Sequence, residues 1–204
     1  MRVITGSARG AKLKTLEGLA TRPTSDRVKE AIFNIIQFDI EGRLETRPTT
    51  GKVKESLFSI IQFDIEGRRV LDLFGGSGQL AIEALSRGAE YAVLVDQSAE
   101  AVKVMKDNLK KVKFDQKASV FQMDYLRYLS TAREKFDIIF LDPPYAEKSL
   151  ENALQKISEI DILSEGGIII CERPKEKVLP PQVGSLLCSK DYCYGKTAVN
   201  LYTR

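Results

Sequence analysis

Apolar and polar residues recur with two different periods along this chain, and each period predicts one type of element. Apolar runs typical of buried strands occupy residues 70–73, 91–95, 118–123, 136–141 and 167–171. Helical spacing occurs within residues 81–85, 99–112 and 149–163, and residues 185–202 predict a closing hairpin that turns near Gly195. Because strands alternate with helices, the sequence predicts right-handed βαβ units and a mostly parallel sheet.

Residues 70–78, Val-Leu-Asp-Leu-Phe-Gly-Gly-Ser-Gly, join the first predicted strand to the helix after it. Glycines let the backbone approach a ligand closely, and a helix N-terminus offers unpaired N–H groups, so this turn predicts a cradle for a cofactor. The order of its residues departs from the dinucleotide-binding pattern G-x-G-x-x-G. The alternative interpretation is an ordinary strand-to-helix turn of an α/β protein.

An acidic residue lies in or close after each of the first four predicted strands. Ligands of open parallel sheets bind outside the carboxyl ends of the strands, where such side chains gather. Each residue alone is also typical of a loop, a helix cap or a turn. The four residues are Asp72, Asp96, Asp124 and Asp142. Asp96 follows Gly76 by 20 residues, the spacing at which a carboxylate reaches a ribose.

The tetrapeptide at residues 142–145, Asp-Pro-Pro-Tyr, follows the fourth predicted strand. Two prolines end the strand and stiffen the loop, so the side chains beside them lose little freedom on binding. A carboxylate accepts hydrogen bonds from an exocyclic amino group, and an aromatic ring stacks on a base. The tetrapeptide therefore indicates a nucleobase site, and the alternative is a rigid turn with a surface tyrosine.

Residues 21–43 and 46–68 form an internal repeat whose copies differ at 6 of 23 positions. Each copy begins with Thr-Arg-Pro-Thr, which predicts an extended loop, and continues as an amphipathic helix. Two copies are too few for a solenoid, so the near-identity indicates a tandem duplication of one helix with its loop. We expect the second copy, next to the first strand, to pack on the domain. The first copy would then cover other surface or exchange with the equivalent helix of a second molecule.

Composition places the chain among single-domain globular proteins, with 204 residues of which 43% are hydrophobic and 29% charged. It contains no histidine, which excludes histidine-based acid–base chemistry and catalytic triads. Its three cysteines lack metal-ligand spacing, so we expect neither a disulfide framework nor a metal site. No apolar run approaches the roughly 20 residues that span a bilayer, and the first residues lack the apolar core of a signal peptide. We therefore expect a cytoplasmic protein.

The net charge of +3 is concentrated in the N-terminal third of the chain. Residues 1–69 hold 13 Lys/Arg and 9 Asp/Glu, whereas the other 135 residues hold 18 and 19. Residues 2–15 predict a small hairpin, or alternatively a frayed terminus, with the basic residues Arg2, Arg9, Lys12 and Lys14. This bias is compatible with a polyanionic partner and with a solvated charged face.

The acidic strand residue with its Phe-Gly-Gly-Ser-Gly turn resembles motif I of S-adenosylmethionine (SAM) methyltransferases, and Asp-Pro-Pro-Tyr resembles motif IV of amino-methyltransferases. The whole chain resembles the RsmD family, bacterial guanine-N2 methyltransferases of small-subunit (16S) ribosomal RNA. Further matching segments, in the family's order, are residues 1–6, 21–30, 83–89 and 194–197. The chain departs from the family at Gly75, where alanine is more usual, and in the duplicated helix.

The resemblance implies a Rossmann-like class I methyltransferase fold, with a mostly parallel seven-stranded sheet and an antiparallel C-terminal edge. It divides the chain into an N-terminal hairpin (1–20), the duplicated segment (21–68) and the methyltransferase domain (69–204). It implies a monomer, although the duplication adds the alternative of a dimer with exchanged helices. The implied partner is ribosomal RNA or a small-subunit assembly particle, with no membrane.

The resemblance also implies roles for individual residues. The expected donor-binding set is Asp72, Phe74, Gly75, Gly76, Ser77, Gly78, Asp96, Gln97, Asp124 and Tyr125. Within it, Asp72 and the glycine turn would hold the methionine end of SAM, Asp96 the ribose, and the last two residues the adenine. The target guanine, extruded from its surroundings, would be bound by Asp142, Pro143, Pro144 and Tyr145. Contacts with RNA phosphates are expected from Arg2, Arg9, Lys12, Lys14, Arg22, Arg27 and Arg47.

Three other functions are compatible with parts of the pattern. An amino-methyltransferase of DNA or another RNA would use the same scaffold, although no segment is long enough for the target-recognition domain usual in the DNA enzymes. A non-catalytic RNA-binding or assembly protein is the alternative that the duplication favours. A nicotinamide-dependent oxidoreductase is disfavoured because G-x-G-x-x-G is missing.

Overall fold

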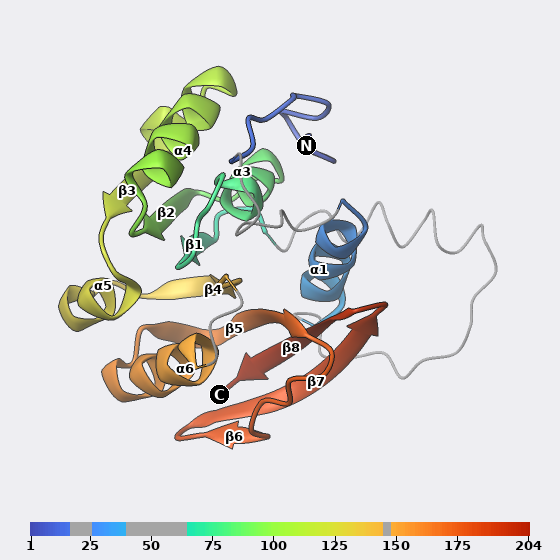
Figure 1. The fold of residues 1–204 in the computed structure, drawn as a ribbon, viewed down its shortest axis with the longest axis vertical. Coiled ribbons are helices and arrows are strands. Elements are labelled where there is room, and N and C mark those ends of the chain that lie inside the picture. Colours follow the sequence, from blue (N-terminus) through green and yellow to red (C-terminus); the bar gives the residue numbers. More distant parts are fainter. Residues whose placement is uncertain (17–25, 40–64, 145–147) are drawn as a thin grey trace.

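The computed structural model of the chain describes residues 1–16, 26–39, 65–144 and 148–204, without the side chains of 26–27 and 35–39. Within them, one mixed sheet has the strand order β3-β2-β1-β4-β5-β8-β7-β6 (Figure 1). The strands are β1 (Arg69–Asp72), β2 (Tyr91–Asp96), β3 (Ala118–Gln122), β4 (Phe136–Leu141), β5 (Leu163–Pro174), β6 (Gln182–Val183), β7 (Leu186–Tyr194) and β8 (Thr197–Thr203). The helices are α1 (Asp26–Asp39), α3 (Gln79–Ser86), α4 (Ala99–Lys111), α5 (Tyr125–Thr131), α6 (Ser149–Ile160) and the short 3₁₀ helix η2 (Asp115–Lys117).

The half of the sheet that contains β1 to β5 is parallel. In this half, β1 pairs with β2 and β4, β2 pairs with β3, and β4 pairs with β5. The central strands are buried on both faces, which is why their sequences are continuous apolar runs rather than alternating ones. The prediction of a mostly parallel α/β sheet is confirmed.

The other edge of the sheet is antiparallel. There, β8 lies between β5 and β7, and β7 pairs with β6. The predicted antiparallel C-terminal edge is confirmed, but the sheet has eight strands rather than the expected seven. The additional strand, β6, contains only two residues, too few to show an alternating pattern in the sequence.

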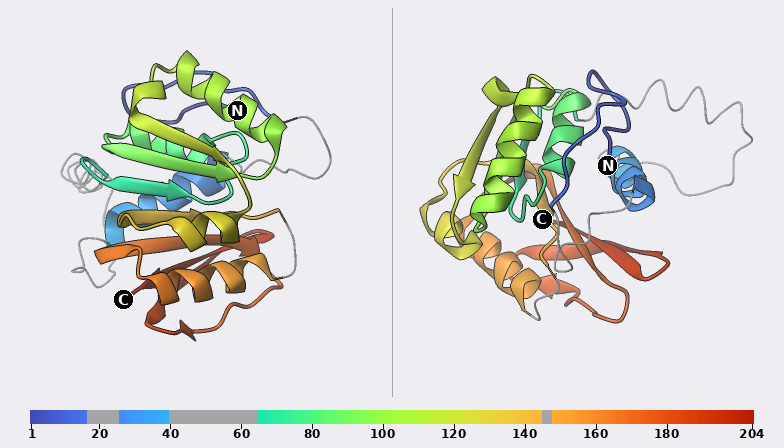
Figure 2. Two further views of the ribbon diagram at one scale, coloured as in Figure 1. Left: turned by 90° about the vertical axis from the view of Figure 1, so that its left-hand side faces the viewer. Right: turned by 45° about the horizontal axis from the view of Figure 1, so that its top comes forward.

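Helices cover both faces of the sheet (Figure 2). Side chains of α1, α3 and α4, among them Ile32, Ile82 and Met105, form one core with the first face. On the opposite face, α5 and α6 contribute Leu129 and Leu154 to a second core. No helix in the described part of the chain is both long and apolar enough to cross a bilayer.

The first copy of the repeat supplies α1, which packs on its own sheet. Val28, Ile32 and Phe33 are buried, and the ring centroids of Phe33 and Phe140 are 5.8 Å apart. Burial of such side chains contributes about 1.5–3 kcal/mol each. We expected the second copy in this position, and the structure places the first copy there instead. Residues 46–64 of the second copy lie outside the described residues, and the residues that are described give no support for helix exchange.

A buried charged cluster fixes the first copy against α3. Lys29 of α1 and Glu83 of α3 are fully buried, with Lys29 Nζ 3.9 Å from Glu83 Oε2. Lys29 Nζ donates to the Arg2 carbonyl at 2.7 Å, and Glu83 accepts from Ile4 N–H at 2.7 Å and from Arg87 Nε at 3.0 Å. Removing one partner from such a cluster leaves a buried charge unpaired, so the cluster fixes α1 against α3. Lys54 is the equivalent residue of the second copy, so the lysine itself does not distinguish the two copies.

Residues 1–16 lie against α3 and α4 and fold back on themselves as a short hairpin, joined by backbone hydrogen bonds of 2.9–3.1 Å. One antiparallel bridge joins Arg2 and Lys12. The Ser86 hydroxyl donates to the Thr5 carbonyl. At Gly6 the φ angle is +78°, and a Cβ would lie only 1.7 Å from the Ser86 carbonyl oxygen. Glycine is therefore required where this segment touches α3.

Candidate active site

The carboxyl ends of β1, β2 and β4 bring three predicted carboxylates to one edge of the sheet. In the strand register, Asp72 lies beside Leu94 of β2 and beside Phe140 of β4. Asp96, the last residue of β2, and Asp142, the first residue after β4, follow those two neighbours by two residues each, so they lie on either side of Asp72. This edge is where open parallel sheets bind their ligands.

The turn between β1 and α3 depends on glycine at several positions. The φ angles of Gly76 and Gly78 are +53° and +77°, in the left-handed region that favours glycine. A Cβ on Gly78 would lie 3.1 Å from Leu94 Cδ2, whereas one on Gly76 would meet only a carbonyl at 3.9 Å. A Cβ on Gly75 would lie 2.6 Å from Met105 Sδ, so Met105 fills the space that an alanine needs there. The turn presents bare backbone at Gly76, as predicted for a cofactor cradle.

Asp96 ties this turn to the end of β2. One carboxylate oxygen accepts a hydrogen bond from Gly76 N–H at 2.9 Å, and the other accepts from Ser98 N–H at 2.8 Å. A carboxylate has about four acceptor sites, so these two bonds leave capacity for the hydroxyls of a ribose. Gln97, predicted to bind the same ligand, is exposed beside it. The spacing of 20 residues between Gly76 and Asp96 therefore corresponds to a direct contact.

Asp72 is buried at the end of β1, with 2% of its surface exposed. Burial, reinforced by the negative charges of Asp142 and Asp96, raises the pKa of Asp72 to about 7. Hydrogen bonds from the backbone N–H groups of Ala81 and Phe74 act in the opposite direction. A cation bound beside Asp72 would favour its ionised form. This edge of the sheet therefore suits a positively charged ligand group.

The stability of the protein is expected to depend on pH through Asp72. Between the ordinary pKa of 3.8 and about 7, the folded chain keeps a proton on Asp72 that the unfolded chain releases. The free energy of unfolding therefore falls as the pH rises through this window. Asp72→Asn removes the effect, because an amide oxygen accepts the same backbone hydrogen bonds without titrating. Urea unfolding should show that the free energy of unfolding falls between pH 5 and pH 8, and that it falls by about 2–3 kcal/mol less in the variant than in the wild type. An equal fall in both proteins would contradict the raised pKa of Asp72.

The junction of β3 and α5 lies next to the end of β2. Met123 N–H donates to the Asp96 carbonyl at 3.0 Å. The exposed Asp124 caps α5, and its carboxylate accepts from two backbone N–H groups of the first turn at 2.9 and 3.3 Å. Tyr125 contacts Phe74 of the glycine turn, with 5.0 Å between the ring centroids. The structure thus places the residues predicted to bind the adenine next to those predicted to bind the methionine end and the ribose of SAM.

The tetrapeptide at residues 142–145 is described in part. Asp142 and Pro143 are half-buried and Pro144 is exposed, while Tyr145 lies outside the described residues. Phe140, which is fully buried near the end of β4, contacts Phe33, so α1 borders the start of the tetrapeptide. The roles of these residues stay predictions.

The predicted RNA-binding residues are also described in part. Four of them are exposed on residues 1–16, namely Arg2, Arg9, Lys12 and Lys14. Arg27 is described only as the second residue of α1. Two of them, Arg22 and Arg47, lie outside the described residues.

Glu172 on β5 was missed in the sequence, and the structure places it next to Asp142. Cys171 pairs with Leu141, and Glu172 and Asp142 are the next residues of their two parallel segments. Phe140 and Ile170, two positions before Asp142 and Glu172, belong to the core that includes α1. Because side chains alternate between the two faces of a sheet, both half-buried carboxylates point towards the face that α1 covers. The predicted strand ended at residue 171, and only its continuation to Pro174 would have revealed Glu172.

Asn108 of α4 is a second residue that the sequence analysis missed. It is fully buried, and its Oδ1 accepts from Lys14 N–H at 2.8 Å. Its Nδ2 donates to the carbonyls of Lys14 and Ser77 at 3.0 and 2.9 Å. One carboxamide therefore links the N-terminal segment, α4 and the glycine turn. No local signal marks it, because its partners lie 94 and 31 residues away.

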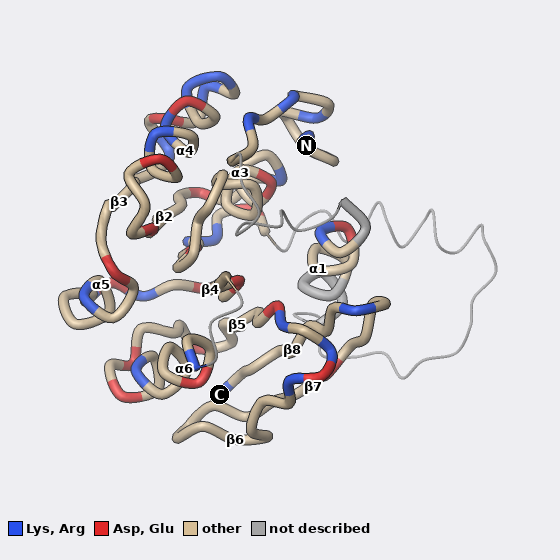
Figure 3. Tube along the Cα trace, in the orientation of Figure 1, with Lys and Arg blue, Asp and Glu red and all other residues tan. Residues whose placement is uncertain are grey.

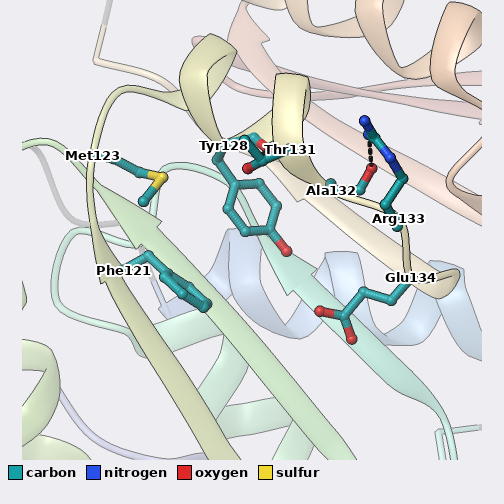
Figure 4. A pocket seen from close by; sticks show the side chains of 7 residues that line it. All are labelled: Phe121, Met123, Tyr128, Thr131, Ala132, Arg133 and Glu134. Atoms are coloured by element: carbon teal, nitrogen blue, oxygen red, sulfur yellow. Dashed lines mark hydrogen bonds between the residues drawn. The ribbon is translucent and has the colours of Figure 1, made fainter.

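A separate hollow lies beside β3 and α5 (Figure 4). It has a volume of about 350 Å³ and is lined by Phe121, Met123, Tyr128, Thr131, Ala132, Arg133 and Glu134. The hydroxyl of Tyr128 is buried there without a hydrogen-bond partner among the described residues, and burial raises the pKa of this group. None of the predicted site residues lines this hollow, although Met123 directly precedes Asp124.

The carboxyl edge of β1, β2 and β4 fits the methyl donor that the sequence predicts. SAM carries a sulfonium and an ammonium group, both positive, beside an adenosine. Carboxylates on three neighbouring strand ends, one of them with a raised pKa, match the positive groups. The open backbone at Gly76 and its hydrogen bond to Asp96 match a ligand that lies across the turn.

Comparisons with known proteins cover the whole chain. The family model described as "Conserved hypothetical protein 95", which represents the RsmD family, matches residues 1–45 and 40–203. The chain belongs to the RsmD family. The two matches meet at the junction of the repeat copies. This membership confirms the predicted methyltransferase fold and SAM as the cofactor of the chain.

Relatives of this RsmD-family chain match it over nearly their full length. The putative rRNA methyltransferase YlbH of Bacillus subtilis is 40% identical over 207 residues, which cover 100% of this chain and 99% of the relative. Ribosomal RNA small subunit methyltransferase D of Haemophilus influenzae is 31% identical over 206 residues, with coverages of 99% and 93%. The solved structure of the putative methyltransferase yhhF of Escherichia coli is 29% identical, with coverages of 100% and 97% and a TM-score of 0.78.

Proposed function

We propose that this methyltransferase transfers a methyl group from SAM to the N2 amino group of a guanine in small-subunit ribosomal RNA, in the cytoplasm. The observation that carries the proposal is the pair of neighbouring carboxylates, Asp142 and Glu172, of which Asp142 lies next to Asp72 at the end of β1. Guanine presents two adjacent donors, N1–H and the N2 amino group, and ionised carboxylates are acceptors only. Adenine and cytosine present an acceptor nitrogen next to their amino groups, so this pair disfavours them.

The names of the relatives support ribosomal RNA as the substrate. Two of them are called an rRNA methyltransferase and a ribosomal RNA small subunit methyltransferase, and the chain aligns with both from end to end. The exposed basic residues of the N-terminal segment agree with a polyanionic substrate.

In this proposal, the donor lies along the glycine turn. Asp72 and the backbone around Gly76 bind its methionine end, Asp96 accepts from the ribose, and Asp124 with Tyr125 holds the adenine. SAM supplies a methyl group that its sulfonium makes electrophilic. The carboxylates of Asp72 and Asp96 bind and orient the donor, and they do not take part in bond formation.

Asp142 orients the amino group of guanine, and catalysis then depends on positioning. The amino nitrogen must lie in line with the bond between sulfur and the methyl carbon. As the nitrogen–carbon bond forms, the carbon–sulfur bond breaks and its electron pair stays on sulfur. The nitrogen loses a proton, which passes to Asp142 or to water. Glu172 accepts from N1–H and keeps the base in this orientation.

Transfer of a labelled methyl group tests the proposal. The protein is incubated with methyl-labelled SAM and with small-subunit particles, naked 16S RNA or DNA from cells that lack this methyl group. Digestion of the labelled product to nucleosides should yield N2-methylguanosine. Label on DNA alone would overturn the substrate, and label on another nucleoside would overturn guanine. Donor uptake without transfer to any nucleic acid would support the non-catalytic alternative.

A further inference from the structure

Positive charge is more strongly segregated in the structure than the N-terminal bias of the sequence indicates. Residues 1–16 contain four basic and no acidic residues, and residues 99–117, from α4 to η2, contain six lysines and three acidic residues. Together these segments carry a formal charge of +7, whereas the whole chain carries +3, so the other residues carry −4. Figure 3 shows the basic positions on α4 and on the N-terminal segment.

The two basic segments are held together side by side. The buried carboxamide of Asn108 bonds both backbone groups of Lys14, and Lys14 Nζ lies 2.7 Å from Asp107 Oδ2. Lys14 beside Asp107 holds the pKa of that carboxyl below its ordinary value, and the charges of Lys103 and Lys110 add to the effect. These lysines therefore lie within electrostatic reach of Lys14. The segments form one surface, although more than 80 residues separate them in sequence.

Most of the lysines on this surface face solvent. The exposed lysines on α4 and just after it are Lys103, Lys106, Lys110, Lys111, Lys113 and Lys117. Asp107, an acidic residue of α4, already has Lys14 as its partner. A surface with this excess of positive charge attracts a polyanion and gives salt-sensitive binding.

The surface is continuous with the donor turn. Asn108, which fixes Lys14, also donates to the carbonyl of Ser77 in the turn at 2.9 Å. The Ser77 hydroxyl lies 3.8 Å from Met1 Sδ, so the start of the N-terminal segment touches the same turn. A nucleic acid bound along this surface would pass next to the donor site.

We propose that residues 1–16 and α4 form one RNA-binding surface, which holds the phosphate backbone of the substrate RNA beside the donor turn. The inference rests on the proposed function and adds α4 to the binding surface, which the sequence alone limited to the N-terminal third. Phosphate contacts of this kind position the RNA without reading its sequence. Selection of the base stays with Asp142 and Glu172.

The double variant Lys103→Gln/Lys110→Gln tests this surface. We expect its Kd for 16S RNA to rise about tenfold at low salt, and the slope of log Kd against log salt to become smaller by about 1.5. The KM for RNA should rise in parallel, and the Kd for SAM in the absence of RNA should stay unchanged.

The matched control is Lys135→Gln/Lys156→Gln, which removes the same charge from a different part of the surface. These lysines pair with Asp161 and Glu159 and lie outside both basic segments. The control should bind RNA like the wild type. If the wild type methylates RNA and the two double variants have the same Kd for RNA, the proposed RNA-binding surface is wrong. If the wild type methylates no RNA, the proposed function itself fails.

Discussion

Asp142→Ala is expected to lower kcat for methyl transfer by about 10³-fold, while the Kd for SAM changes by less than about threefold. Removal of one group that orients or stabilises the reacting atoms commonly costs 10²–10³ in rate, and transfer in this site depends on positioning. Asp142 lies beyond the end of β4, beside the buried Asp72 and next to Glu172, rather than in the glycine turn. The substitution should therefore impair the orientation of the target base and leave the binding of SAM intact.

Single-turnover transfer and donor titration separate the two effects. Asp142→Asn is the matched variant, because its amide oxygen still accepts from the amino group but cannot take up the proton. If Asp142 is the proton acceptor, Asn and Ala should be equally inactive; if water is, Asn should retain part of the rate. An alanine variant of normal activity would remove Asp142 from the mechanism.

Glu172→Gln is expected to lower kcat/KM for RNA by about 10- to 100-fold, which corresponds to one hydrogen bond to a charged group. A glutamine keeps the size of the side chain but loses the charge that the proposal places at N1–H. Glu165→Gln is the control, because Glu165 is exposed on the same strand at its other end and away from the carboxyl edge. Its kinetics should match those of the wild type.

Nucleoside competition gives Glu172 a readout that a merely structural role would not change. Guanosine should inhibit wild-type transfer better than 1-methylguanosine, which lacks the N1–H donor. In Glu172→Gln, whose amide oxygen still accepts from N1–H but carries no charge, the difference between the two inhibitors should become smaller. An unchanged preference for guanosine in the variant would exclude Glu172 from recognition of the base.

The strands and their ends were predictable because their signals are local. The predicted strand at 136–141 has the same bounds as β4, and the helix predicted at 99–112 ends one residue later than α4. Buried parallel strands are continuous apolar runs, and an acidic residue or a proline marks where each one ends. The prediction that Asp72, Asp96 and Asp142 meet at one edge followed from these residues at the strand ends and from the rule that ligands bind at the carboxyl ends of parallel strands.

The features that the sequence did not reveal depend on contacts between distant residues. Asn108 reads as one polar residue in a lysine-rich helix until residues 1–16 fold over it. Glu172 lies on the part of β5 that is extended by pairing with β8, and this pairing is not visible locally. The two repeat copies have nearly the same propensities and both carry this lysine, as Lys29 and Lys54, so the sequence does not show which copy becomes α1.

The central claim is that the methyl donor is held at the carboxyl edge of β1, β2 and β4. Isothermal titration calorimetry with S-adenosylhomocysteine, the demethylated product, tests it most directly. We expect one site per chain in the wild type, at least about tenfold weaker binding in Asp96→Ala, and wild-type affinity in Asp115→Ala, which changes an exposed aspartate of η2. A wild type that takes up no product, or an Asp96→Ala variant that binds as tightly as the wild type, would contradict the claim.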